Sequence, residues 1–119
     1  MFRYTALTLG LWAAVVPGFS LAETSDAESL LIKQGYFWQA QDKPKRAAES
    51  WEKVLLLDAS QPDALYGLGI IAVERAQLPR AQAYLQRLQA IEPLPRQALQ
   101  LEQDIRLAAP ANKQLLEQA

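Results

Sequence analysis

The side chains that most often carry out catalysis are scarce in this chain. It contains no histidine and no cysteine, which removes the commonest general base, the thiolate nucleophile and most ligands of transition metals. Carboxylates remain, and a pair such as Glu49 and Glu52 could in principle hydrolyse a glycosidic bond. The neighbouring Lys45, Arg46 and Lys53 instead favour a solvated, charged helix face. We therefore predict no catalytic residues.

Other motifs that could support catalysis or phosphate binding are incomplete. Gly67-Leu68-Gly69 is only a fragment of a phosphate-binding loop, and no strand precedes it, so close packing explains these glycines better. Ser29, Ser50 and Ser60 lack both a nucleophile-elbow sequence and a histidine partner. We predict that the protein is not an enzyme and that it binds no cofactor and no metal.

The elements that must position any site follow from an internal repeat. Gly35 recurs as Gly69, and Ala47 recurs as Ala81, each after a shift of 34 residues. Small residues let two antiparallel helices approach closely, and large apolar residues then fill the space around the contact. The positions that we expect to pack within and between the repeats are Gly35, Trp38, Ala47, Trp51, Leu68, Gly69, Ala81 and Leu85.

This spacing resembles the tetratricopeptide repeat (TPR) family, whose helix-turn-helix unit has a period of about 34 residues. Three positions depart from the family pattern: Gln34 replaces a leucine, Ala72 an aromatic residue and Ala59 a closing proline. The resemblance implies an all-α fold, a short TPR-like solenoid of antiparallel helical hairpins, with repeats at 28–61 and 62–95. Stacked hairpins usually bind partners and do not transform them.

Capping residues and prolines predict where the helices begin and end. Ser25-Asp26-Ala27-Glu28 is a capping-box pattern, so the first helix is expected at about 26–41. Prolines at 44, 62 and 79 suit the first turns of helices at about 44–57, 62–75 and from 78 until Pro93. Beyond Pro95 the repeat loses its register, but 96–108 is amphipathic and is expected to cover the second hairpin. Pro110 is expected to end this covering helix, and a further helix is expected to start within 111–119.

Residues 1–22 are expected to lie outside this helical domain of residues 23–119. Arg3 precedes an uncharged apolar run at 6–16, which is too short to span a bilayer, and Ser20 and Ala22 occupy signal-peptidase positions. We predict a secretory signal peptide cleaved between Ala22 and Glu23. An uncleaved membrane anchor or a buried helix is the alternative.

The charge balance limits the class of partner. The chain has 12 basic and 13 acidic residues, and removal of 1–22 would remove one charge, that of Arg3. Nucleic acids and anionic membrane surfaces are bound through concentrated lysine and arginine, so a near-neutral, evenly mixed chain argues against both. Half of the residues are hydrophobic, which predicts one folded domain.

The TPR resemblance also predicts a binding surface, because the first helix of each hairpin lines the inner groove of the solenoid. Two tyrosines there could present a ring to a peptide or a sugar, and the polar residues could supply hydrogen bonds. The alternative is that these residues only cover neighbouring helices. Trp38 and Trp51 fall on core positions of the family. The groove candidates are Tyr36, Gln39, Asp63, Tyr66, Ile70 and Glu74.

A closer resemblance is carried by residues 34–40, 47–55 and, above all, 58–69. These segments are similar to the first repeats of the cellulose biosynthesis operon protein C family, whose members are exported and carry a long periplasmic TPR scaffold before an outer-membrane pore. The resemblance implies a non-catalytic periplasmic scaffold in cellulose, or other exopolysaccharide, biosynthesis and export. This chain would be an N-terminal fragment of a longer exporter. Its partners would be proteins of the synthase and export complex or the glucan chain, with outer-membrane association only through a missing C-terminal region.

Two other functions stay open. The first is a generic periplasmic TPR adaptor for protein partners in envelope assembly, and the second is a polysaccharide hydrolase accessory that uses carboxylates. None of the groove candidates is a lysine or an arginine, which disfavours a groove that binds the terminal carboxylate of a peptide.

Overall fold

The computed structural model describes the fold of residues 21–118 and the side chains of 25–109. Within these residues the secondary structure is entirely helical, which confirms the all-α class for this part of the chain. The predicted signal peptide falls almost wholly on residues outside this description, and the TPR assignment stays a prediction. The helices are α1 (Leu21–Ala40), α2 (Pro44–Leu57), α3 (Pro62–Glu74), α4 (Leu78–Gln89) and α5 (Arg96–Gln118).

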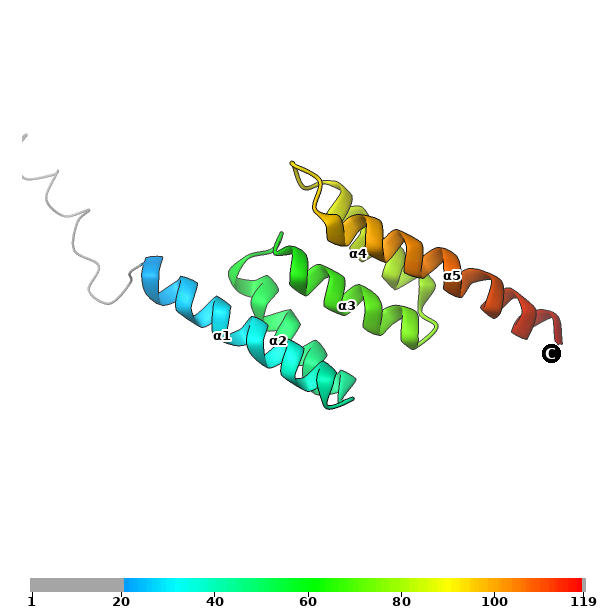
Figure 1. Ribbon diagram of the computed structural model, residues 1–119, viewed down its shortest axis with the longest axis horizontal. Coiled ribbons are helices and arrows are strands. Elements are labelled where there is room, and N and C mark those ends of the chain that lie inside the picture. Colours follow the sequence, from blue (N-terminus) through cyan, green and yellow to red (C-terminus); the bar gives the residue numbers. More distant parts are fainter. Residues whose placement is uncertain (1–20, 119) are drawn as a thin grey trace, which may run out of the picture.

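The helices form two packed hairpins and a fifth helix that closes the second hairpin. In Figure 1, α1, α3 and α5 lie side by side, and α2 and α4 lie behind them. α2 packs on α1 and α3, while α5 packs on α3 and α4. Among the described residues, no helix is both long and apolar enough to cross a membrane.

The 34-residue shift recurs in the backbone of the two hairpin turns. Asp42 and Ala76, which are 34 residues apart, have φ angles of 55° and 58°. At the end of α1, the Lys43 N–H donates to the Trp38 carbonyl at 2.9 Å, and at the end of α3 the Gln77 N–H donates to the Ala72 carbonyl at 2.8 Å. A residue in the left-handed conformation, followed by a hydrogen bond back to the carbonyl five residues earlier, is the Schellman motif. This motif satisfies carbonyls that have no partner within the helix.

Local chemistry accounts for the starts of the three middle helices. Each has a proline in its first turn, as expected, where the missing N–H costs nothing. At α3 the N-cap is Gln61, whose Oε1 accepts from the Ala64 N–H at 2.8 Å. In the preceding turn, the Ser60 backbone N–H donates to Asp58 Oδ1 at 3.1 Å.

Two predicted boundaries are wrong. α1 begins at Leu21, so the Ser25 capping box lies within the helix. Leu, Ala and Glu are good helix formers, and they extend the helix upstream of the box. α5 runs through Pro110 to Gln118 without the expected break. A proline removes only its own N–H and crowds the preceding turn, so it can kink a helix without ending it.

The core consists of two clusters that meet between the hairpins. Seven of the eight predicted packing positions are buried, and Trp38 is half-buried. α5 contributes three buried residues against the second hairpin, in the position expected of a covering helix. The first cluster contains Ala47, Trp51, Val54, Ala64, Leu68 and Ile71; the second contains Leu65, Ala72, Ala81, Leu85, Leu88, Ala98, Leu101 and Ile105.

Trp51 of α2 joins the two hairpins. Its side chain is fully buried, and it lies against two glycines, Gly35 of α1 and Gly67 of α3. A Cβ on Gly35 would come within 2.5 Å of Trp51 Cε2, and a Cβ on Gly67 would come within 2.6 Å of the same atom. Gly69 differs from the expectation: the space beside it is filled by Leu101 of α5, because α5 crosses α3 at this point.

Candidate functional site

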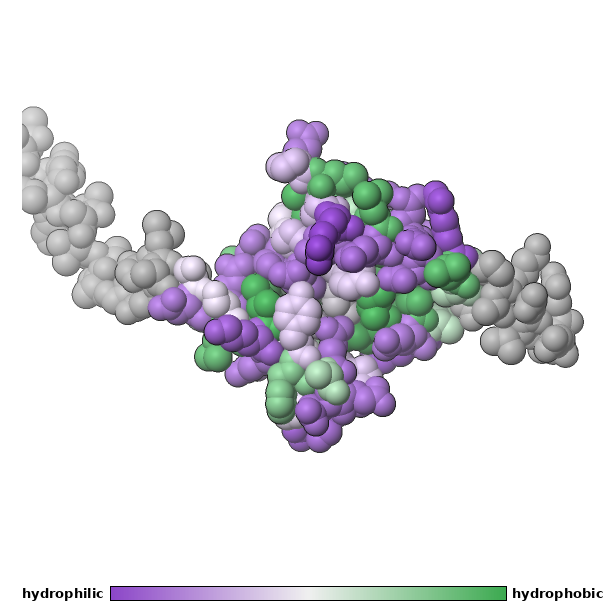
Figure 2. Space-filling view, viewed as in Figure 1, coloured by the Kyte–Doolittle hydropathy of each residue, from purple (hydrophilic) through white to green (hydrophobic). Residues whose placement is uncertain are grey.

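The predicted groove lies on the face formed by α1, α3 and α5. In Figure 2 this face carries hydrophilic residues with hydrophobic residues in separate patches between them. Tyr36 of α1 is 49% exposed, and its ring meets Trp51 edge to face, with ring centroids 5.0 Å apart. Tyr36 is therefore packed against the buried tryptophan and remains partly accessible to solvent.

Asp63, at the start of α3, accepts hydrogen bonds from two glutamine side chains, one of them on α5. Its Oδ1 accepts from Gln97 Nε2 of α5 at 3.0 Å, and its Oδ2 accepts from Gln61 Nε2 at 3.3 Å. The negative charge of this carboxylate also contributes to raising the pKa of Tyr36 of α1. Further along α3, the Tyr66 hydroxyl donates to Asp104 Oδ2 of α5 at 3.2 Å. These hydrogen bonds fix α3 and α5 relative to each other.

The environment of both tyrosines disfavours their charged form. Burial is the largest cause that raises the pKa of Tyr36 to about 12; the nearby Asp63 carboxylate adds to the rise, and Arg96 opposes it. Burial, followed by the charge of Asp104 and the hydrogen bond to it, raises the pKa of Tyr66. Both hydroxyls therefore stay protonated donors at any physiological pH.

We expect the stability of the domain to fall as Tyr36 ionises. Because its folded pKa lies above the usual value of 10.0, the stabilising contribution is complete below pH 10 and is lost as the pH rises through 12. Phenolate absorbance of the wild type minus that of Tyr36→Phe measures this titration. Asp63→Asn removes the adjacent charge and should move the Tyr36 midpoint downward, and an unchanged midpoint would show that the Asp63 charge does not act on the hydroxyl.

The remaining groove candidates do not join this cluster. Gln39 and Glu74 line a separate hollow, together with Asp42, Lys43, Pro44 and Ile71, near the turn ends of α1 and α3. Ile70 packs against the second core cluster. The six candidates thus fall into a Tyr36–Asp63–Tyr66 group, a Gln39–Glu74 group and one residue that covers the core.

Sequence reasoning missed the α5 half of the site. Gln97 and Asp104 provide the partners of Asp63 and Tyr66, yet the groove prediction contains no residue after Glu74. The 34-residue shift contains the signal, since it relates Asp63 to Gln97 and Ile70 to Asp104. This third copy of the repeat is hard to recognise, because the same shift places Gln103 where the repeat has glycine and Ala119 where its first copy has Trp51.

The residues weighed for catalysis are dispersed. Glu49 and Glu52 are exposed on α2, while Ser29 and Ser60 are exposed and Ser50 is buried. In the part of the chain that the structure describes, no group of acidic residues is arranged to hold a metal ion.

Comparison with known proteins shows that the chain is similar in sequence to part of two much longer proteins. It is 56% identical over all 119 residues to the cellulose synthase operon protein C of Pseudomonas fluorescens (strain SBW25), of which it covers 9%. It is 39% identical over 80 residues, 67% of this chain, to the protein of the same name from Xanthomonas axonopodis pv. citri (strain 306), of which it covers 5%. The chain thus spans less than a tenth of the length of either relative. No protein-family model and no solved structure matches it.

Proposed function

We propose that this chain is a non-catalytic scaffold module of TPR type in bacterial cellulose biosynthesis and export. The observation that carries the proposal is the 56% identity, over the whole chain, to a protein named cellulose synthase operon protein C. The helical hairpins, the repeated turn geometry and the hydrogen bonds between α3 and α5 support a rigid binding surface.

The proposal includes the periplasm as the site of action. It rests on the composition of residues 1–22, with an apolar run too short for a bilayer and small residues before Glu23. Cleavage after Ala22 would remove the first two residues of α1 and release a chain that carries the rest of the first hairpin and the whole of the second. A fusion of residues 1–119 to a periplasm-dependent reporter enzyme tests this, with Ala22→Tyr as the variant expected to retain the leader.

We also propose that the module is the N-terminal part of a longer protein. Two observations support this: the relatives are more than ten times as long, and Leu99 and Leu107 of α5 are 60% and 69% exposed. A following helix that packed on α5 would cover these leucines, as each helix of a solenoid covers the one before it. Through its groove, the module would hold partner proteins or guide the glucan between synthase and outer membrane.

The experiment is an in-frame deletion of codons 25–109 in the gene of the native host. We expect cellulose outside the cell to fall to the background of a strain without the synthase, while glucan synthesis by isolated membranes persists. Export should be restored by the wild-type gene and equally by a Glu49→Gln, Glu52→Gln double variant. Unchanged export after the deletion would refute the scaffold role, and a soluble, folded double variant that fails to restore export would refute its non-catalytic nature.

A further inference from the structure

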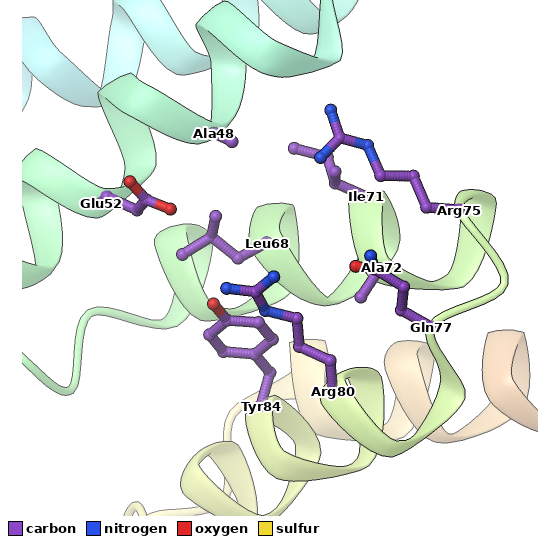
Figure 3. A pocket seen from close by; sticks show the side chains of 9 residues that line it. All are labelled: Ala48, Glu52, Leu68, Ile71, Ala72, Arg75, Gln77, Arg80 and Tyr84. Atoms are coloured by element: carbon purple, nitrogen blue, oxygen red, sulfur yellow. The ribbon is translucent and has the colours of Figure 1, made fainter.

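A second surface feature lies on the face opposite the groove. A small hollow with a volume of about 40 Å³ opens between α2 and α4, with α3 as its floor. Figure 3 shows Ala48 and Glu52 of α2 on one side, and Arg75 and Gln77 on the other, with Arg80 and Tyr84 of α4 below. The hollow therefore belongs to both hairpins.

Two arginines line this hollow without a partner among the described residues. Arg75 ends α3 and Arg80 lies in the first turn of α4, and both side chains line the hollow. Neither guanidinium forms an ion pair or a side-chain hydrogen bond with another described residue. Other arginines of the described chain are engaged: Arg87 donates to the Ala59 carbonyl at 2.8 Å, Arg106 pairs with Glu102, and Arg46 lies over the Trp38 ring.

The floor of the hollow is apolar. Leu68, Ile71 and Ala72 of α3 form it, and the ring of Tyr84 adds a wall with a hydroxyl group. Glu52 supplies a single negative charge on the far side. The site thus offers two planar guanidinium groups beside a small apolar surface, a combination that suits a carboxylate next to an aliphatic side chain.

We propose that this hollow binds an acidic segment of a partner protein, with a carboxylate between Arg75 and Arg80 and an adjacent apolar side chain on Leu68 and Ala72. A neutral glucan carries no charge to match the two arginines, so the hollow and the groove would serve different ligands. The inference rests on the scaffold role proposed above, because it names a class of protein partner for the scaffold. Its test measures binding directly and does not depend on cellulose export.

The test is a titration of the isotope-labelled chain, followed by NMR. The probe is the capped tripeptide acetyl-Glu-Leu-Glu-amide, and its matched neutral control is acetyl-Gln-Leu-Gln-amide. We expect saturable shifts of the Arg75 and Arg80 Nε–H signals with the acidic peptide, and at least about tenfold weaker binding of the neutral one, since the charge-assisted bonds are lost.

Three variants are expected to change the affinity for the acidic peptide in different directions. Arg80→Gln should weaken binding of the acidic peptide about tenfold, whereas Glu52→Gln should tighten it severalfold, because it removes a like charge from the hollow. Arg106→Gln makes the same charge change as Arg80→Gln at an exposed position outside the hollow, and should leave the affinity unchanged. Unperturbed backbone amides in α1, which contains none of the substituted residues, would show that each variant remains folded.

Several outcomes would overturn the proposal. These are the absence of saturable shifts, equal weakening by Arg80→Gln and Arg106→Gln, and equal affinity for the two peptides. Binding of a cello-oligosaccharide in the hollow, in place of the acidic peptide, would assign it to the glucan. If export were independent of the module but the acidic peptide bound as expected, the scaffold role would fail while the hollow remained a peptide site.

Discussion

Replacing Trp51 with alanine is expected to lower the free energy of unfolding by about 3 to 5 kcal/mol, the usual cost of truncating a large buried aromatic residue. Trp51 is fully buried and lies between Gly35 of α1 and Gly67 of α3. Its loss would remove the contact that joins the two hairpins. Because domains of this size are only marginally stable, we expect most of the fold to be lost at moderate temperature. Urea denaturation followed by circular dichroism measures the effect.

Two further variants separate packing from other roles of tryptophan. Trp51→Phe keeps an aromatic ring against the glycines and removes an indole Nε1–H that is buried without a partner among the described residues, so its cost should be clearly smaller than that of alanine. Trp38→Ala should also cost less, because Trp38 is only half-buried beneath Lys43 and Arg46. A Trp51→Ala protein that unfolds at the wild-type urea concentration would refute this packing scheme.

Replacing Gly67 with alanine is expected to destabilise the domain by at least about 2 kcal/mol, although alanine is the better helix former. The added Cβ would overlap the indole ring of Trp51, with only 2.6 Å to Cε2. The ring has little room to move aside, because Gly35 of α1 also lies against it. Relief therefore requires α3 to move away from α2, which opens the core between the hairpins.

Gly69→Ala is the matched control on the same helix. Its Cβ would meet the terminal methyl groups of Leu101, the nearest at 2.5 Å, and these can shift by rotation of the leucine. We expect a stability within about 1 kcal/mol of the wild type, since the gain in helix propensity offsets part of the repacking cost. A Trp51→Leu background should largely remove the penalty of Gly67→Ala, as expected for two residues in direct contact. Additive costs would show that the two side chains do not compete for space.

Much of the helical framework could be predicted because its causes are local. The ends of α2 follow from Pro44 and the turn after Leu57, and its predicted bounds coincide with the observed helix. The same holds within one or two residues for the start and end of α3. Where competing local signals were present, prediction was less successful. The capping box at Ser25 did not start α1, and Pro110 did not end α5.

The candidate site could be predicted only in part. The TPR resemblance predicted Tyr36, Asp63 and Tyr66 as residues of one face, because the first helix of each hairpin lines the inner groove in that family. It did not identify what they contact: the partner of Tyr66 is 38 residues away in sequence, and that of Asp63 is 34 residues away on α5. The hydrogen bonds of Asp63 and Asp104 hold α3 and α5 together, and amino-acid composition alone does not reveal this.

By itself, the sequence determined the helices, the turns with their 34-residue spacing, and the stripe of each helix that is buried. These depend on capping, on backbone conformation and on apolar periodicity, which act over a few residues. Only the tertiary structure decided that Trp51 lies between Gly35 and Gly67, that Leu101 fills the space beside Gly69, and that Arg75 and Arg80 line one hollow. Such contacts depend on how helices cross and rotate when their side chains interdigitate, and that is settled by the packing of the whole core.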